Sequence, residues 1–249
     1  MAGSDSREVC PFLTVLSRAD GLAPQNTFAG CGTGQGSRGG AAAEPTRTSG
    51  VEGKPLSGAD LERATITGTD LVGYEVQRET AATFASRKSA DPAECAPAMR
   101  AVGGSSGFAA TARTARLVFP KERGSSAHMT LASHSPGDAR QVIDALRTAA
   151  ERCETFKDIL VDFDYDAIQL QPDPGYGDES VSLRLTQLAS YGEGDEPVRV
   201  PHAVVAVRQG ATVVMFTTLN RPFGPRGKEP VAVPKAIIEA QLNKLMAAK

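Results

Sequence analysis

The segment from Ser135 to Phe156 carries the strongest structural signal in the sequence. Ser135 suits the cap of a helix, Pro136 suits its first turn, and Asp138 completes a capping box. Apolar residues then recur at helical spacing: Ala139, Val142, Ile143, Leu146, Ala149, Ala150, Cys153 and Phe156. We therefore predict a helix over residues 135–156 whose apolar face packs on a core.

Cys153 lies on this apolar face, and Cys95 lies 58 residues earlier, within a segment, residues 92–102, that suits a short helix. A disulfide between the two cysteines would fasten the long helix to that segment. Closing a loop of this length stabilises a domain by roughly 4 kcal/mol in the chain-entropy model. Two separate buried thiols are the alternative. A metal-binding or reactive role is less favoured, because the sequence has no C-x-x-C and no histidine near either cysteine.

The rest of the domain alternates between helix and strand patterns. Ser57 and Asp60 form another capping box, and apolar residues from Ile237 to Met246 share one face of a closing helix. Strand patterns cover residues 74–78, 113–119, 127–133, 159–165, 167–171, 181–190, 203–208 and 212–219. This order predicts an α+β fold: a central, mostly antiparallel sheet with helices packed on one face and one disulfide, Cys95 to Cys153.

Residues 1–54 have a different composition, rich in glycine and serine, and we expect a leader followed by a disordered tether. The run Phe28-Ala29-Gly30-Cys31 resembles a bacterial lipobox, which predicts lipidation of Cys31. The preceding residues lack the basic and apolar regions of a signal peptide. Either translation starts elsewhere than at Met1, or the match arises by chance and the segment is a plain tail.

Charge and hydropathy exclude several classes of protein. The formal net charge is -2, with basic residues scattered among acidic ones, so we expect no nucleic-acid partner. The longest apolar runs, such as 203–207 and 213–216, fall far short of the roughly 20 residues that span a bilayer. Membrane association would therefore depend on the lipid anchor alone.

Two glycine-rich motifs invite a catalytic interpretation. Gly34, Gly36 and Gly39 match G-x-G-x-x-G, but no strand precedes them and no helix follows, so we expect no nucleotide site. Residues 103–107 match G-x-S-x-G around Ser105, yet their flanks do not read as a strand and a helix. A flexible loop is the favoured interpretation, and we predict no catalytic residue and no cofactor.

Acidic and histidine residues are the candidate metal ligands. Asp162, Asp164 and Asp166 would share one face of a strand, but the calcium-loop glycine and glutamate are missing, so a solvated face is favoured over a weak cation site. The three histidines, His128, His134 and His202, have no helical i, i+4 pair. We predict no metal site.

Four features together resemble a known family. They are residues 61–74 (LERATITGTDLVGY), Cys95, the helix ending at Cys153, and the hairpin around Arg208-Gln209-Gly210. In this order they are similar to the PknH-like extracellular sensor domains, which occur on bacterial serine/threonine kinases and as free-standing lipoproteins. The resemblance implies an α+β fold with a cleft for a small ligand, and no catalytic residues. Kinase-attached members can carry two disulfides, whereas residues 55–249 contain only two cysteines.

These arguments predict that residues 55–249 form a non-enzymatic sensor-like or ligand-binding domain. We expect it to lie outside the cytoplasm on a lipid anchor at the cell membrane, or to be secreted. Its partner is an unknown small ligand. One alternative is a cell-envelope protein that binds another protein through a sheet edge or apolar patch. Another is a small secreted serine hydrolase, which would need Ser105 within hydrogen-bond reach of a histidine.

Overall fold

The computed structural model describes residues 53–79, 89–122, 125–190, 192, 194, 196–220 and 231–248. The predicted lipidation site Cys31 and the motif at Gly34, Gly36 and Gly39 lie outside these residues.

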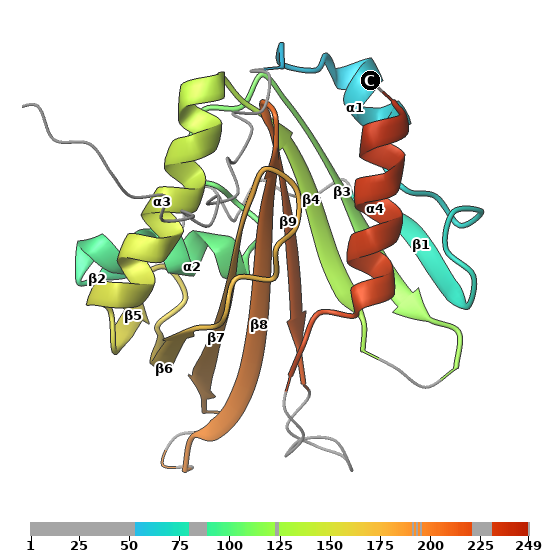
Figure 1. The fold of residues 1–249 in the computed structure, drawn as a ribbon. Coiled ribbons are helices and arrows are strands. Elements are labelled where there is room, and N and C mark those ends of the chain that lie inside the picture. Colours follow the sequence, from blue (N-terminus) through green and yellow to red (C-terminus); the bar gives the residue numbers. More distant parts are fainter. Residues whose placement is uncertain are drawn as a thin grey trace, which may run out of the picture. The chain divides into compact units, whose positions relative to one another are not determined.

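The described strands form one nine-stranded sheet with the order β1-β3-β4-β9-β8-β7-β6-β5-β2 (Figure 1). All neighbouring strands pair antiparallel. The strands are β1 (Tyr74–Glu79), β2 (Ala90–Asp91), β3 (Ala112–Pro120), β4 (Ala127–Ser133), β5 (Phe156–Asp158), β6 (Phe163–Leu170), β7 (Glu179–Ala189), β8 (Val198–Gln209) and β9 (Thr212–Leu219). The predicted central antiparallel sheet is confirmed.

The helices of the described residues are α1 (Gly58–Arg63), the short 3₁₀ helix η2 (Ala93–Cys95), α2 (Ala96–Val102), α3 (Pro136–Arg152) and α4 (Lys235–Ala247). No helix among them is both long and apolar enough to cross a membrane. Helix α3 begins as predicted, because Ser135 Oγ accepts a hydrogen bond of 3.1 Å from the Asp138 backbone N–H. The same capping arrangement joins Ser57 to Asp60 at the start of α1.

The predicted end of the long helix is wrong. Helix α3 stops at Arg152, and Cys153 already has extended backbone angles. Phe156 begins β5, where it pairs with Tyr165 of β6 and stacks on its ring at a centroid distance of 4.9 Å. Pairing with β6 buries the Phe156 ring against another aromatic ring, which a further helical turn would not provide.

The prediction that the helices pack on one face is also wrong. Helices α2 and α3 cover one face of the sheet, and α1 and α4 cover the other (Figure 1). Strand β8 contributes to both cores, because Val204 and Ala206 pack with α3 while Val205 and Val207 pack with α4. Both faces of the central strands are apolar, so each face needs its own cover.

Cys95 and Cys153, the pair predicted to form a bridge, are joined in the structure. Their Cα atoms lie 5.7 Å apart, inside the range that a disulfide tolerates. Both cysteines are buried in the core between α2, α3 and the sheet. The bridge therefore fastens the η2-α2 segment to the end of α3, as the sequence indicated.

Candidate functional site

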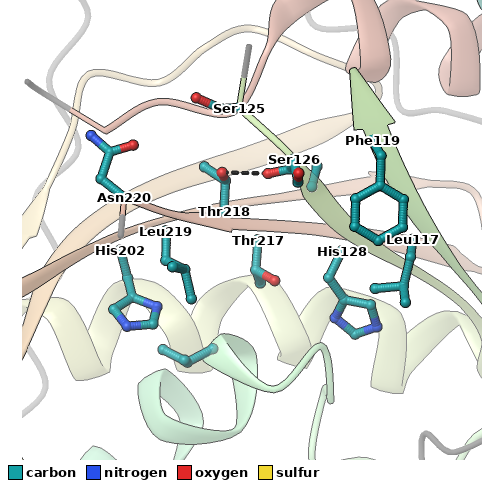
Figure 2. A pocket seen from close by; sticks show the side chains of 12 residues that line it. Leu117, Phe119, Ser125, Ser126, His128, His202, Thr217, Thr218, Leu219 and Asn220 are labelled. Carbon is teal, nitrogen blue, oxygen red and sulfur yellow. Dashed lines mark hydrogen bonds between the residues drawn. The ribbon is translucent and has the colours of Figure 1, made fainter. Parts of the chain in front are cut away.

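A cavity of about 500 Å³ opens on the α2-α3 face of the sheet, beyond the last residue of α2 (Figure 2). Cavities of this size are typical of small-molecule sites in proteins. The described residues that line it are Val102, Leu117, Phe119, Ser125, Ser126, Ala127, His128, His202, Thr217, Thr218, Leu219 and Asn220. None of these lining residues is Lys, Arg, Asp or Glu.

The strand register determines which side chains form the floor of this cavity, the part that lies on the sheet. Leu117 of β3 is opposite His128 of β4, which is opposite Thr217 of β9. Residues opposite one another in an antiparallel pair point to the same face. On the other side of β9, Leu219 is opposite His202 of β8. Strand pairing thus brings together residues that lie up to about a hundred positions apart in the chain.

His128 is held from two sides. Its Nε2 atom lies 2.5 Å from Glu79 Oε2, and neither atom has another hydrogen-bond partner among the described residues. Glu79 reaches diagonally across β3, where it is opposite the short side chain of Ala115. Gly104, in the loop after α2, approaches the other edge of the imidazole so closely that a Cβ there would meet His128 Cε1 at 2.6 Å. The ring is therefore fixed, and a larger residue at position 104 would displace it.

His202 is fixed from the neighbouring strand. Its Nε2 atom lies 3.1 Å from Gln187 Oε1, so Nε2 carries the hydrogen and donates it. The ring also lies beside that of Tyr165, at a centroid distance of 6.2 Å. With a strand spacing of about 4.8 Å and a rise of about 3.3 Å per residue, the Cα atoms of His128 and His202 lie about 12 Å apart.

The two neighbouring threonines of β9 differ in their hydrogen bonding. Thr218 Oγ1 donates to the Ser126 backbone carbonyl at 2.6 Å, which ties β9 to the start of β4. Thr217 points into the space between the two histidines (Figure 2), and no hydrogen bond joins its hydroxyl to any described residue. The Thr217 side chain is nearly buried, with 6% of its surface exposed. The Thr217 hydroxyl is therefore a polar group on the floor of the cavity that can form a hydrogen bond with a bound molecule.

The Ser105 hydroxyl has partners other than a histidine. Its Oγ atom accepts a hydrogen bond from the Gly107 backbone and lies 3.5 Å from Arg113 Nη2. Within the described part of the chain, Ser105 makes no hydrogen bond with His128, His134 or His202. The arrangement that the hydrolase alternative requires is therefore missing there.

His134 lies apart from the cavity, fully buried just after the end of β4. Its Nδ1 atom lies 2.8 Å from the Ala109 carbonyl oxygen and donates to it, while Nε2 is buried without a partner among the described residues. Burial lowers the pKa of His134, and the positive charge of Arg113 acts in the same direction, although the bond to Ala109 opposes them. The structure therefore does not bring the three histidines together.

The three aspartates are divided between different partners. Asp162 lies in the turn before β6 and pairs with Lys157, whereas Asp166 pairs with both terminal nitrogens of Arg199. Asp164 is exposed on β6. The described residues contain no group of three His, Cys, Asp or Glu side chains suited to holding a metal ion.

Sequence reasoning missed Leu117 and Thr217, which line the cavity, and Glu79, which contacts His128. The signal present was strand alternation, which places Thr217 and Leu219 on one face of β9. Alternation does not reveal which strands become neighbours, so the cavity could not be assembled from it. His128 and His202 stand out in the sequence as potential metal ligands, whereas the structure makes them walls of a cavity.

Fold and site together define an α+β domain in which an antiparallel sheet, covered by helices on both faces, carries a ligand-sized cavity on one face. No family model matches the chain, and no curated protein matches it. The structure is similar to the crystal structure of the extracellular domain of PknH from Mycobacterium tuberculosis, with a TM-score of 0.49 and 8% sequence identity. The match covers 78% of this chain and 97% of that chain.

Proposed function

We propose that residues 55–249 form a non-enzymatic, sensor-like domain that binds a small molecule in the cavity lined by His128, Thr217 and His202. The observation that carries the proposal is the cavity of about 500 Å³ on one face of the antiparallel sheet. Its walls combine apolar side chains with a few fixed polar groups, which is the usual composition of a small-molecule site. The partners of Ser105 support a binding role rather than a hydrolytic one.

Ligand binding is better supported than docking of a protein partner. A docking role would be favoured by a large exposed apolar patch without a cleft. In the described residues the exposed large apolar side chains are scattered, apart from one turn at Ile159, Leu160 and Val161. A ligand-sized cavity is present, so we favour the small molecule.

Tryptophan scanning with a matched control tests this proposal, because the chain contains no tryptophan. Leu219 lines the cavity and Leu170 on β6 is not among the lining residues, yet both are 46% exposed. The full-length Leu219→Trp and Leu170→Trp variants would each be titrated with a library of small aromatic and aliphatic compounds. Binding in the cavity should change the indole emission of the Leu219→Trp variant and leave that of the Leu170→Trp variant unchanged.

Compounds that pass this test should also stabilise the wild-type chain. A ligand present at a hundred times its Kd adds about 2.7 kcal/mol to the free energy of unfolding. Emission changes that are equal in both variants, or a library without a single stabilising compound, would argue against a ligand site in this cavity.

We further propose that the chain is exported and anchored through a lipid on Cys31. The run Phe28-Ala29-Gly30-Cys31 and the bridge between Cys95 and Cys153 support this, because disulfides persist mainly outside the cytoplasm. Metabolic labelling with a clickable fatty acid should mark the wild type and the Cys10→Ser control, and should not mark Cys31→Ser. Equal labelling of Cys31→Ser and the wild type, or no labelling of any of them, would remove the lipoprotein proposal.

A further inference from the structure

The Thr217 side chain, of which 6% is exposed, indicates which chemistry the cavity recognises. Buried polar groups in proteins are almost always hydrogen-bonded, to protein, water or ligand. Thr218, its neighbour in the chain, already donates to Ser126, whereas no hydrogen bond joins the Thr217 hydroxyl to any described residue. Because Thr217 points into the cavity between His128 and His202 (Figure 2), a molecule inside the cavity can supply the hydrogen-bond partner of its hydroxyl.

The surroundings of Thr217 restrict the charge of that partner. Lys, Arg, Asp and Glu do not occur among the described lining residues. The carboxylate of Glu79, which approaches the floor from β1, is already engaged with His128 Nε2. An ionised ligand would lose its hydration without gaining a counter-charge, which is costly in free energy.

Apolar side chains define the rest of the ligand. Leu117 and Phe119 of β3 lie on one side of Thr217 in Figure 2, and Leu219 of β9 lies on the other. An aromatic or alicyclic body would bury its surface against these side chains. Its polar group would then meet the threonine in the middle of the floor.

We propose that the ligand is an uncharged molecule with an apolar ring body and a hydroxyl group that hydrogen-bonds with Thr217. This inference rests on the proposed function of the cavity and adds the chemical class of the ligand. Thr217 acts as the specificity-determining residue.

Three probes of the same ring system test it: 2-naphthol, naphthalene and 2-naphthoate. Their dissociation constants for the full-length wild type would be measured at pH 7 from shifts of the amide NMR signals of Thr217 and Leu219. One net hydrogen bond should make 2-naphthol bind about fivefold more tightly than naphthalene. The anion 2-naphthoate should bind more weakly than both.

Two valine variants separate a specific role of Thr217 from a structural one. Thr217→Val keeps the shape of the side chain and its strand preference, so it should still bind both neutral probes while losing the preference for 2-naphthol. Thr186→Val makes the same change on β7, outside the described lining, and should keep the preference.

The outcomes distinguish the two proposals. Equal binding of 2-naphthol and naphthalene to the wild type, or a preference that survives in Thr217→Val, would refute the role of Thr217 and leave the cavity as a binding site. Tightest binding by 2-naphthoate would refute the uncharged class. If none of the three probes shifts the cavity signals, the inferred ligand class fails, whereas the proposed function is refuted only when the wider compound library also fails.

Discussion

Breaking the bridge between Cys95 and Cys153 should cost the domain a large part of its stability. The sequence separation is 58 residues, and in the chain-entropy model a closed loop of that length contributes about 4 kcal/mol. Both cysteines lie in the core that α2 and α3 share with the sheet, so the bridge restrains segments that also pack together. A loss of about 4 kcal/mol corresponds to a fall in Tm of about 10 °C for a domain of this size.

The measurement is urea denaturation followed by far-UV circular dichroism, since the chain has no tryptophan to report by fluorescence. The measurement would use a variant that carries Cys10→Ser and Cys31→Ser. Its only remaining cysteines are Cys95 and Cys153, so a reductant can act only on the bridge. In this background, dithiothreitol and the Cys95→Ala, Cys153→Ala double substitution should lower the midpoint by similar amounts.

A midpoint that is indifferent to the reductant would refute the reasoning, because the two cysteines would then contribute only as separate buried thiols. A large effect of dithiothreitol that persists in the alanine variant would assign the loss to another cause. The expected result would make the folded domain dependent on an oxidising compartment.

Two further predictions concern buried polar groups. Gln241 of α4 accepts from the Ile66 N–H at 3.0 Å and donates to the Ala64 carbonyl at 2.7 Å, so Gln241→Leu should lower the free energy of unfolding by about 3 kcal/mol, whereas Asn243→Leu on the exposed side of α4 should change it by less than about 0.5 kcal/mol. A small loss in Gln241→Leu, measured by the same urea denaturation, would mean that these backbone groups find other partners. The second prediction concerns His134, whose pKa is lower in the folded chain than in the unfolded chain. The unfolded chain therefore binds a proton more readily as the pH falls below about 6.5, the ordinary pKa of histidine. Proton binding favours unfolding, so the free energy of unfolding falls with the pH in this range. Between pH 7.5 and 5.5 the wild type should therefore lose more stability than His134→Gln, and parallel pH profiles would contradict this.

Local signals predicted the parts of the fold that depend on neighbouring residues. The capping pattern at Ser135 and Asp138 predicted the start of α3 because the bonds that it specifies lie within one helical turn. The end of α3 could not be predicted in this way. Phe156 suits the apolar face of a helix, and only the presence of Tyr165 across β6 shows why it belongs to a strand.

The two-sided sheet does leave a signal in the sequence. Residues 203–207 and 213–216 are continuous apolar runs, which are typical of strands buried on both faces. Above, these runs are compared only with the length of a membrane span, for which they are too short. Interpreted as central strands, they would have predicted helices on both faces.

The cavity depends on strand order, which the pattern of single strands does not contain. His128 and Thr217 become neighbours only because β4 pairs with β9, and Glu79 reaches His128 only because β3 lies between β1 and β4. The sequence could indicate that each residue lies on a strand. It could not indicate that these residues lie together at one cavity.

The pairing of β4 with β9 also has a consequence for how the chain matures. Strands β1, β3 and β4 and both bridge cysteines precede residue 154, so they are synthesised before β9 at residues 212–219. A growing chain can therefore acquire its covalent bond while the outer edge of β4 still lacks a partner. An open edge of this kind recruits other extended chains. Products terminated before residue 212 are accordingly expected to aggregate even when their disulfide is correct.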